Sequence, residues 1–282
     1  MRLVSFNEFK KVYQGVVRAV YGNWTLEMQE EMARYCYGWN PRKFNVRTYL
    51  EASVLRYYHA YQTIAESGDY HTICDIGGFW GVFPITLKLF GFEVTLTESL
   101  KYYGSSFKNL FSFILSQGVH IIDYDPFHPG TPPGRYHIIT AMAILEHYPY
   151  SLRIFIDNLL SMMERGSRLY IEVPNIAYWP KRMGLLRGQT PLTPIQDIYR
   201  SEAPFIGHHH EFTIYELRDL AELSNLEIVK ELLYTYSVTG SMMTRLFQAP
   251  ISTFIQSICP QTRECLAVLC QRKEKKISNG QV

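Results

Sequence analysis

Apolar residues follow two different spacings along the chain. Over the segment 1–70 they recur every three or four positions, which is the period of an α-helix. This pattern predicts three helices, one ending before Gly22, one over 25–37 and one over 45–67. From residue 73 onward, short apolar runs typical of buried strands alternate with helical patterns. The predicted strands cover 73–76, 93–97, 119–123, the start of 136–148, 168–173, 226–233 and 264–271. The helices between them cover the segment that ends at Gly91, then 102–116, 151–164, 213–225 and 241–258, the last interrupted at Pro250. The helix over 213–225 begins with a predicted capping box, with Thr213 as its N-cap and Glu216 at the third helical position.

Strands that alternate with helices at this spacing require a mostly parallel sheet with helices on both faces. We therefore expect an α/β fold with a Rossmann-like, seven-stranded, mostly parallel sheet. The expected organisation is a helical N-terminal cap over 1–70, an α/β domain over 71–272 with an insertion at 174–211, and a solvated tail over 273–282. The third predicted helix is rich in tyrosine, which fits either an aromatic lid or half-buried tyrosines with surface hydroxyls.

The most informative stretch is the strand, turn, helix and strand between residues 72 and 98. The first strand carries Asp75 and leads into a turn that contains Gly77, Gly78 and Gly81. Glycines let backbone N–H groups approach a ligand closely. Glu98 closes the second strand, and its separation from Asp75 fits the spacing of roughly 20 residues that is expected for a ribose-binding acid. The unit is therefore typical of a nucleoside site, although the same glycines also fit a turn that serves packing alone.

Composition narrows the possible partners and compartments. The chain has 282 residues, is 47% hydrophobic and carries a net charge of +2, with its basic residues scattered. Neither nucleic acid nor a membrane span is indicated, because no basic patch and no run of about 18 apolar residues occurs. The five cysteines show no metal-type pairing, and the N-terminus lacks the apolar core of a signal peptide. We expect a cytoplasmic protein, and the sequence leaves its oligomeric state open.

The segment D-I-G-G-F-W-G, with its downstream acid, resembles the first motif of the class I methyltransferases that use S-adenosyl-L-methionine. That family's loop is acid-x-Gly-x-Gly-x-Gly, and Phe79 stands here in place of the middle glycine. The resemblance implies S-adenosyl-L-methionine as the cofactor. The cofactor-binding residues that it implies in this stretch are Asp75, Gly77, Gly78, Phe79, Gly81 and Glu98.

Two later strand ends extend the resemblance. In the family an acid after the third strand binds the adenine amino group, a role that falls on Asp125, with Asp123 in reserve. Asp125 equally fits a turn-initiating residue before a proline. The fourth strand and the following Leu-Glu-His resemble the family's central strand and turn, and a last strand that returns after a helical insertion fits the family's reversed seventh strand. The resemblance places the backbone of Ala141 and Met142 at the methionine part of the cofactor and His147 near the transferred methyl, as a catalytic or a structural histidine.

The segment 174–211 holds five prolines and leaves the carboxyl end of a central strand, where open α/β sheets bind ligands. It resembles a cap in one branch of these methyltransferases, which acts on small molecules, sugars or lipid-linked intermediates. We take Asn175, Arg182 and Arg187 as substrate-binding candidates, since the two arginines, together with Lys181, can hold a phosphate or carboxylate. A solvated basic loop is the alternative.

Three consecutive histidines, 208–210, end this insertion. The branch pattern is Gly-His-x-Arg-x-Phe-Thr, so His208 matches its histidine and His210 replaces its arginine. The resemblance favours His208 as a general base or acceptor-positioning residue and His210 as a substrate-binding residue, while a loop-anchoring histidine fits equally well. Adjacent histidines point apart, and the pair 208 and 210 would need a further ligand from elsewhere, so no metal is expected.

These observations predict an enzyme that transfers a methyl group from S-adenosyl-L-methionine to a small-molecule acceptor, with a hydroxyl favoured. The alternative is a cofactor-binding scaffold or regulatory protein without catalysis, motivated by Phe79. A nicotinamide oxidoreductase is disfavoured, because no register of the glycines supplies Gly-x-Gly-x-x-Gly.

Overall fold

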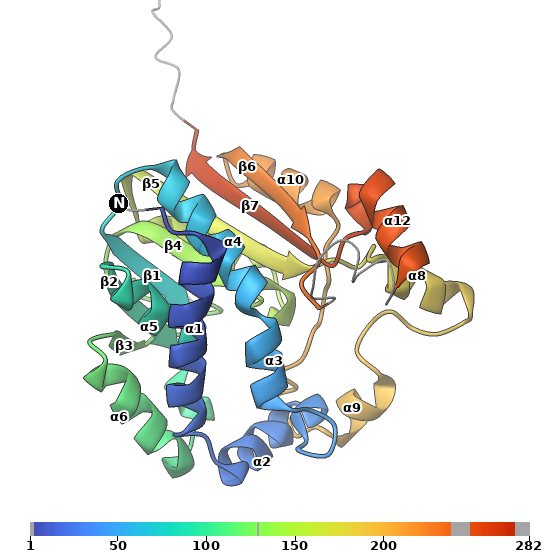
Figure 1. The fold of residues 1–282 in the computed structure, drawn as a ribbon, viewed down its shortest axis with the longest axis horizontal. Coiled ribbons are helices and arrows are strands. Elements are labelled where there is room, and N and C mark those ends of the chain that lie inside the picture. The colour runs from blue at the N-terminus through green and yellow to red at the C-terminus, as the bar shows by residue number, and fades with distance from the viewer. Residues whose placement is uncertain (1–2, 129, 238–248, 274–282) are drawn as a thin grey trace, which may run out of the picture.

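The computed structural model describes residues 3–128, 130–237 and 249–273. Its centre is one seven-stranded sheet with the order β3-β2-β1-β4-β5-β7-β6 (Figure 1). The strands are β1 Thr72–Ile76, β2 Glu93–Glu98, β3 His120–Asp123, β4 Tyr136–Met142, β5 Met163–Pro174, β6 Leu226–Tyr234 and β7 Cys265–Arg272. The sheet is mixed, because β7 runs antiparallel to both of its neighbours while β1 to β5 pair in parallel. This confirms the expected seven strands and the reversed last strand.

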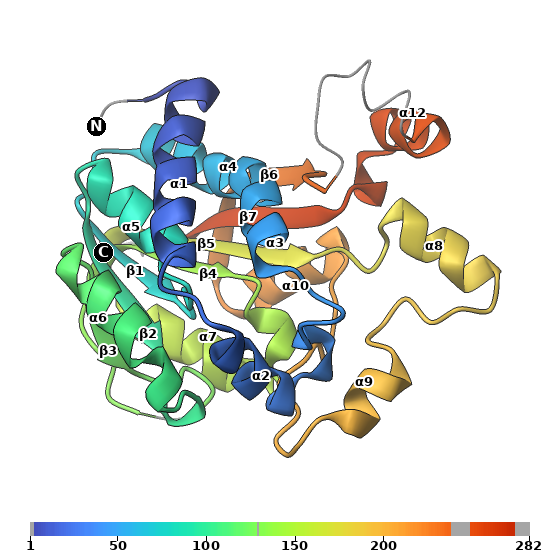
Figure 2. The same cartoon turned by 60° about the horizontal axis from the view of Figure 1, so that its bottom comes forward.

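Helices cover both faces of the sheet (Figures 1 and 2). Consecutive residues of a strand point to opposite faces, and Ile73 and Cys74 of β1 accordingly belong to two different hydrophobic clusters. The Ile73 cluster includes residues of α1 Phe6–Tyr21, α4 Val54–Ser67, α5 Val82–Leu89 and α6 Lys108–Ser116, and also of α2 Leu26–Tyr35 and α3 Val46–Ala52. The Cys74 cluster packs against α7 Leu152–Ser161 and α10 Ile214–Leu223. Helices from the segment 1–70 therefore share a hydrophobic core with the sheet. That this segment forms a separate cap stays a prediction.

Local capping explains where the N-terminal helices begin. The side chains of Ser5, Thr25 and Asn45 accept hydrogen bonds from the first turns of α1, α2 Leu26–Tyr35 and α3 Val46–Ala52. The single helix predicted over 45–67 is wrong in one respect, since Ser53 divides it into α3 and α4. The Ser53 hydroxyl donates to the Tyr49 carbonyl, a side-chain bond that competes with regular helix geometry.

Two other predicted helix boundaries differ from the structure by three residues or more. The helix predicted from residue 102 begins only at Lys108, after two short 3₁₀ turns separated at Gly104, whose N–H is held by Glu31. The helix predicted to residue 164 ends at Ser161, because the backbone of Met162 and Met163 pairs with Tyr136 of β4. The helix predicted from residue 241 is described only as α12 Pro250–Ile258, and the rest of that prediction lies outside the described residues. The capping box predicted at Thr213 is confirmed.

The insertion over 174–211 is partly helical, with α8 Trp179–Leu186 and α9 Ile195–Arg200 standing out from the sheet (Figure 2). Its end returns to the sheet at Phe212, which forms a bridge with Asn175 just after β5. Backbone bonds from Glu202 and Ile206 to α2 tie the same segment to the N-terminal helices. Within the three described ranges, no helix combines the length and the apolarity that a membrane crossing requires.

A buried ion pair joins the N-terminal helices to the sheet. Arg56 of α4 contacts Glu172 of β5, and their side chains are only 4% and 1% exposed. The Tyr234 hydroxyl also donates to Glu172, and Arg56 donates to the Tyr49 hydroxyl at 3.0 Å. Each charge therefore has further hydrogen bonds, which a buried pair needs to offset its desolvation.

Removal of this arginine is expected to destabilise the chain strongly. Arg56→Met leaves Glu172 buried without its cation, a change that costs about 3–5 kcal/mol. The matched control is Arg34→Met, which breaks the exposed Arg34–Glu202 pair, whose side chains are 56% and 53% exposed, and should leave stability unchanged within error. Urea unfolding of the three proteins measures the difference. Equal stabilities for the two variants would contradict a structural role for the buried pair.

Candidate functional site

A cavity of about 600 Å³ opens at the carboxyl ends of the parallel strands. Its walls come from the glycine turn after β1, the ends of β2, β4 and β5, the N-terminal helices, and the segments 191–194 and 206–211. Ligands of open α/β sheets bind at this edge, and the volume is that of a small-molecule site. The cavity therefore lies at the carboxyl ends of the strands, where the sequence predicts the site.

The glycine turn is packed tightly against a buried carboxylate. Gly77 has a φ of +65°, a left-handed conformation that favours glycine. A Cβ at Gly78 would lie 2.2 Å from Oδ2 of Asp75, so a side chain at this position would collide with the acid. Asp75 also accepts a hydrogen bond from the Thr140 hydroxyl. The backbone of Gly77 and Gly78 and the carboxylate of Asp75 therefore lie close together on the cavity wall.

Phe79, which replaces the family's middle glycine, does not fill the cavity. Its ring stacks on Tyr103 at 5.2 Å between centroids and lies 4.9 Å from the ring of Trp80. Trp80 in turn packs against Trp39 and Tyr49. Both large rings therefore belong to an aromatic cluster between the turn and the N-terminal helices, and the cavity remains open beside them.

Glu98 lies at the end of β2 and faces the same cavity. Its Oε1 accepts from the Phe79 N–H and its Oε2 from the Tyr103 hydroxyl, both at 2.9 Å. A carboxylate has about four acceptor positions, so these two donors do not occupy all of them. Burial raises the pKa of Glu98 to about 7, and it raises the pKa of Asp75 to about 7 as well.

Asp125 lines the cavity from the loop after β3. Lys101 donates to its carboxylate at 2.9 Å, and the N–H of Phe127 donates at 3.0 Å. Burial opposes ionisation of Asp125, but these donors together hold its pKa below the usual value. Asp123, the reserve candidate, instead accepts from the N–H of Leu100. The structure thus favours Asp125 over Asp123 as a residue that a ligand can reach.

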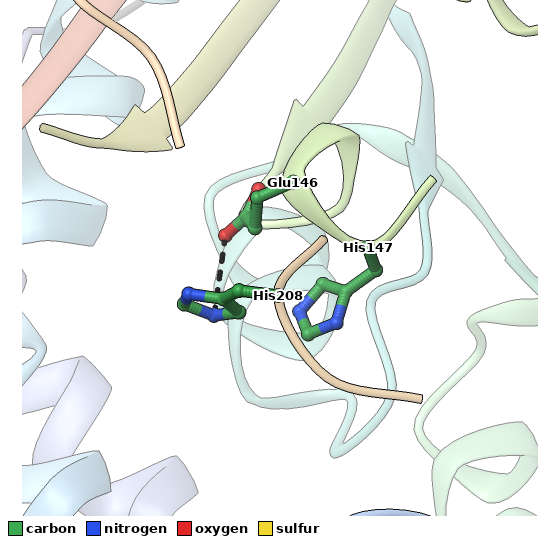
Figure 3. A group of neighbouring side chains, drawn as sticks. All are labelled: Glu146, His147 and His208. Atoms are coloured by element: carbon green, nitrogen blue, oxygen red, sulfur yellow. Dashed lines mark ion pairs between the residues drawn. The ribbon is translucent and has the colours of Figure 1, made fainter. Parts of the chain in front are cut away.

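The two catalytic candidates, His147 and His208, lie side by side. Their ring centroids are 4.8 Å apart, although the two residues are distant in sequence. The 3₁₀ turn Leu145–His147 (η4) follows β4, and its Glu146 carbonyl accepts from the N–H groups of His209 and His210. These backbone bonds place the histidine-rich loop against η4 (Figure 3).

Two carboxylates lie next to the His208 imidazole. Nδ1 of His208 lies 3.0 Å from Oε1 of Glu211, and its Nε2 lies 3.9 Å from Oε1 of Glu146. Lys181 contacts the other oxygen of Glu211. Burial raises the pKa of Glu146 to about 7 and lowers the pKa of His147 to about 3. His147 is therefore a neutral imidazole at physiological pH.

Most of the other predicted site residues lie away from the cavity wall. Met142 lines the cavity, but Ala141 is buried within β4. Gly81 faces Ile114 of α6, so its missing side chain serves helix packing. The remaining polar candidates are engaged elsewhere or exposed: Asn175 donates to Gln261 and Arg263, Arg182 donates to Ala177, His210 pairs with Glu216, and Arg187 is exposed.

Several cavity residues were not singled out from the sequence. Glu172 interrupts an apolar strand and Arg56 interrupts an apolar helical pattern, and such interruptions are a usable signal for buried charges. Glu146 precedes a predicted histidine, and Glu211 follows the histidine run. Tyr49, among the tyrosines of the third predicted helix, also lines the cavity, so part of that tyrosine pattern serves the site.

A family model described as "Methyltransferase domain" matches residues 46–231 of this chain. No protein among the curated sequences is significantly similar to it. The matched segment runs from α3 to β6 and includes the glycine turn, η4 and the histidine-rich loop.

Solved methyltransferases share the fold. A putative sarcosine dimethylglycine methyltransferase from Galdieria sulphuraria is 9% identical, with a TM-score of 0.52 over 79% of this chain and 88% of that one. Magnesium protoporphyrin IX methyltransferase from Synechocystis with bound SAH is 15% identical, with a TM-score of 0.50 over 83% and 88%. Mitomycin 7-O-methyltransferase is 16% identical, with a TM-score of 0.50 over 80% of this chain and 56% of that longer chain.

The raised pKa of Glu98 predicts a pH-dependent stability for the ligand-free chain. The folded state binds a proton at Glu98 below about pH 7, whereas the unfolded state binds it only below about pH 4. The free energy of unfolding that this proton contributes is therefore fully present below about pH 4 and is lost as pH rises through 7. Between pH 5 and pH 8 this loss is about 2–3 kcal/mol. Urea unfolding should show a smaller decline for Glu98→Gln than for the parent, and an unchanged decline for Glu93→Gln at the exposed start of β2. Identical pH profiles for the parent and Glu98→Gln would contradict the assignment.

Proposed function

The chain belongs to the methyltransferase-domain family, and from this premise we propose that it methylates a hydroxyl group of a small molecule. S-adenosyl-L-methionine is the cofactor. The observation that carries the proposal is the pair of buried carboxylates, Asp75 and Glu98, on either side of a glycine turn in one cavity with His208.

Each part of the cofactor has a matching group on the wall. The free acceptor positions of Glu98 suit the two ribose hydroxyls, and Asp75 suits the methionine ammonium. Asp125 suits the adenine amino group, and Met142 an apolar contact with the methionine chain. The cofactor brings positive charge to buried acids, which favours their ionised form and offsets the cost of their burial.

Methyl transfer asks the protein mainly for placement. The acceptor oxygen attacks the methyl carbon, the carbon–sulfur bond breaks, and its electron pair stays on sulfur as the thioether of the product. Holding the two reactants in line and excluding water supplies several kcal/mol of the barrier reduction. The hydroxyl proton passes to Nε2 of His208, because Glu211 engages Nδ1 and thereby orients the ring. His147 supports the loop as a neutral neighbour.

The part of the cavity wall that comes from the segment 1–70 is aromatic. Trp39, Phe44, Tyr49 and Tyr57 line it, all from the segment 1–70. Such a wall favours an acceptor with an apolar or planar body that presents its hydroxyl toward His208. The N-terminal helices are therefore proposed as the acceptor-binding cap.

Loss of the carboxylate at Glu98 is expected to weaken cofactor binding. Glu98→Ala removes charge-assisted hydrogen bonds to the ribose and should cost about 1–3 kcal/mol. Isothermal titration with S-adenosyl-L-methionine and S-adenosyl-L-homocysteine measures the effect. Glu93→Ala, at the exposed start of the same strand, is the matched control and should bind like the parent. Equal affinities for all three proteins would show that the ribose assignment is wrong.

Replacement of the proposed base is expected to slow methyl transfer without loss of cofactor binding. His208→Asn should lower the rate about 10²–10⁴-fold, and His210→Asn on the same loop should lower it little. The assay follows labelled methyl from the cofactor to a panel of planar and apolar alcohols and phenols. Cofactor binding with no labelled product across the panel and a cell extract would instead favour a non-catalytic scaffold.

A further inference from the structure

The cluster of Glu146, His147 and His208 holds polar atoms that the protein itself leaves unsatisfied (Figure 3). Glu146 is fully buried, and neither of its carboxylate oxygens has a hydrogen-bond partner among the described residues. Nδ1 of His147 is buried in the same condition. Unpaired buried polar groups cost about 1–3 kcal/mol each, and more when charged, so such a cluster calls for an explanation.

The contacts of the two ring nitrogens of His208 indicate which kind of ligand would satisfy these atoms. Glu211 engages Nδ1 of this ring at 3.0 Å, which leaves Nε2 facing Glu146 at 3.9 Å. Lys181 contacts Glu211 in turn and fixes that carboxylate. A carboxylate behind one imidazole nitrogen, with the other nitrogen directed into a group of ligands, is the arrangement that orients metal-binding histidines.

We propose that Glu146, His147 and His208 bind one divalent transition-metal ion, with a remaining coordination position open to the cavity. One ligand atom from each residue lies within 4.8 Å of the other two. Ligands of a tetrahedral ion with bonds of about 2.0–2.1 Å lie roughly 3.4 Å apart, so small side-chain rotations close the site. Two imidazoles and one carboxylate suit Zn²⁺, Co²⁺ or Fe²⁺ rather than Mg²⁺ or Ca²⁺.

The ion explains what hydrogen bonding does not. A dication would pair with the buried carboxylate of Glu146, so that the unsatisfied oxygens of this side chain become ligands, and would take one ring nitrogen from each of the two histidines. Glu146 and His147 belong to η4, and His208 belongs to the loop 206–211, which rejoins the sheet at Phe212. Because all three residues line the cavity, the open coordination position faces the space proposed for the acceptor.

The binding test does not depend on methyl transfer. The whole chain is treated with a chelator and titrated with Zn²⁺ in competition with a chromophoric chelator, and with Co²⁺, whose visible absorption reports tetrahedral coordination. One ion per chain is expected. Glu146→Gln, His147→Ala and His208→Ala should each weaken Zn²⁺ binding more than 100-fold, and Glu211→Gln about 10–100-fold.

The neighbouring histidines provide the matched controls. His209→Ala and His210→Ala alter the exposed part of the same run and should leave affinity unchanged. A loss with these variants as large as with His208→Ala would mean that the histidine run binds zinc by itself and would overturn the site. Absence of stoichiometric binding by the parent would overturn it as well.

Folding of the variants is checked separately. The side chain of His208 is 35% exposed, so His208→Ala is the variant least disturbing to the core. Zn²⁺ should raise the melting temperature of the parent and not that of His208→Ala, since only a folded state with the site gains binding energy. An equal rise in both proteins would contradict the proposal. Nε2 of His208 is the proposed base in the metal-free chain and a ligand in the loaded chain, and it cannot fill both roles at once, so Zn²⁺ should slow methyl transfer. The binding results above do not use methyl transfer, so a failure of the proposed function leaves them unaffected.

Discussion

The buried pair of Arg56 and Glu172 is the interaction on which the arrangement of the site depends. It joins the first helices to the carboxyl end of β5, and both residues line the cavity. An ion pair removed from water is stable only when further hydrogen bonds satisfy both charges, as Tyr49 and Tyr234 do here. The pair therefore specifies how the N-terminal helices sit over the strand ends, and the aromatic wall of the cavity follows from that position.

Around this pair the cavity gathers more negative than positive charge. Asp75, Glu98 and Glu146 are buried on its walls, and burial raises the pKa of each to about 7. Such groups are destabilising when ionised and unpaired, so they favour ligands that bring positive charge. The cofactor proposed at Asp75 and Glu98 and the divalent ion proposed at Glu146 would both bring such positive charge to the cavity.

The loop 206–211 links these two ends. Its backbone is held by the carbonyl of Glu146 and by α2, so the imidazole of His208 has a defined place although it lies on a loop. Binding residues on loops gain their geometry from a rigid scaffold, and here the scaffold is the end of β4 on one side and the N-terminal helices on the other. A change in either support would move the proposed base and the proposed ion together.

Much of the fold follows from local pattern. Seven strands, the mixed sheet's reversed last strand and the capping box at Thr213 were predictable, because strand alternation and helix capping depend on residues close in sequence. The glycine turn with Asp75 and the strand-end acid Glu98 were predictable for the same reason, since one βαβ unit contains them all. Boundaries such as the break at Ser53 were not, because side-chain bonds and strand pairing shift them.

The sequence by itself thus determined the type of sheet, the position of its ligand edge and the acids of the first strand–turn–helix–strand unit. Only the tertiary structure decided that Arg56 meets Glu172, that His147 and His208 share one cluster with Glu146, and that Asn175 and His210 turn elsewhere. The physical reason is distance along the chain. Contacts between residues tens of positions apart depend on how whole elements pack and on which buried charges find partners, and no local pattern encodes either.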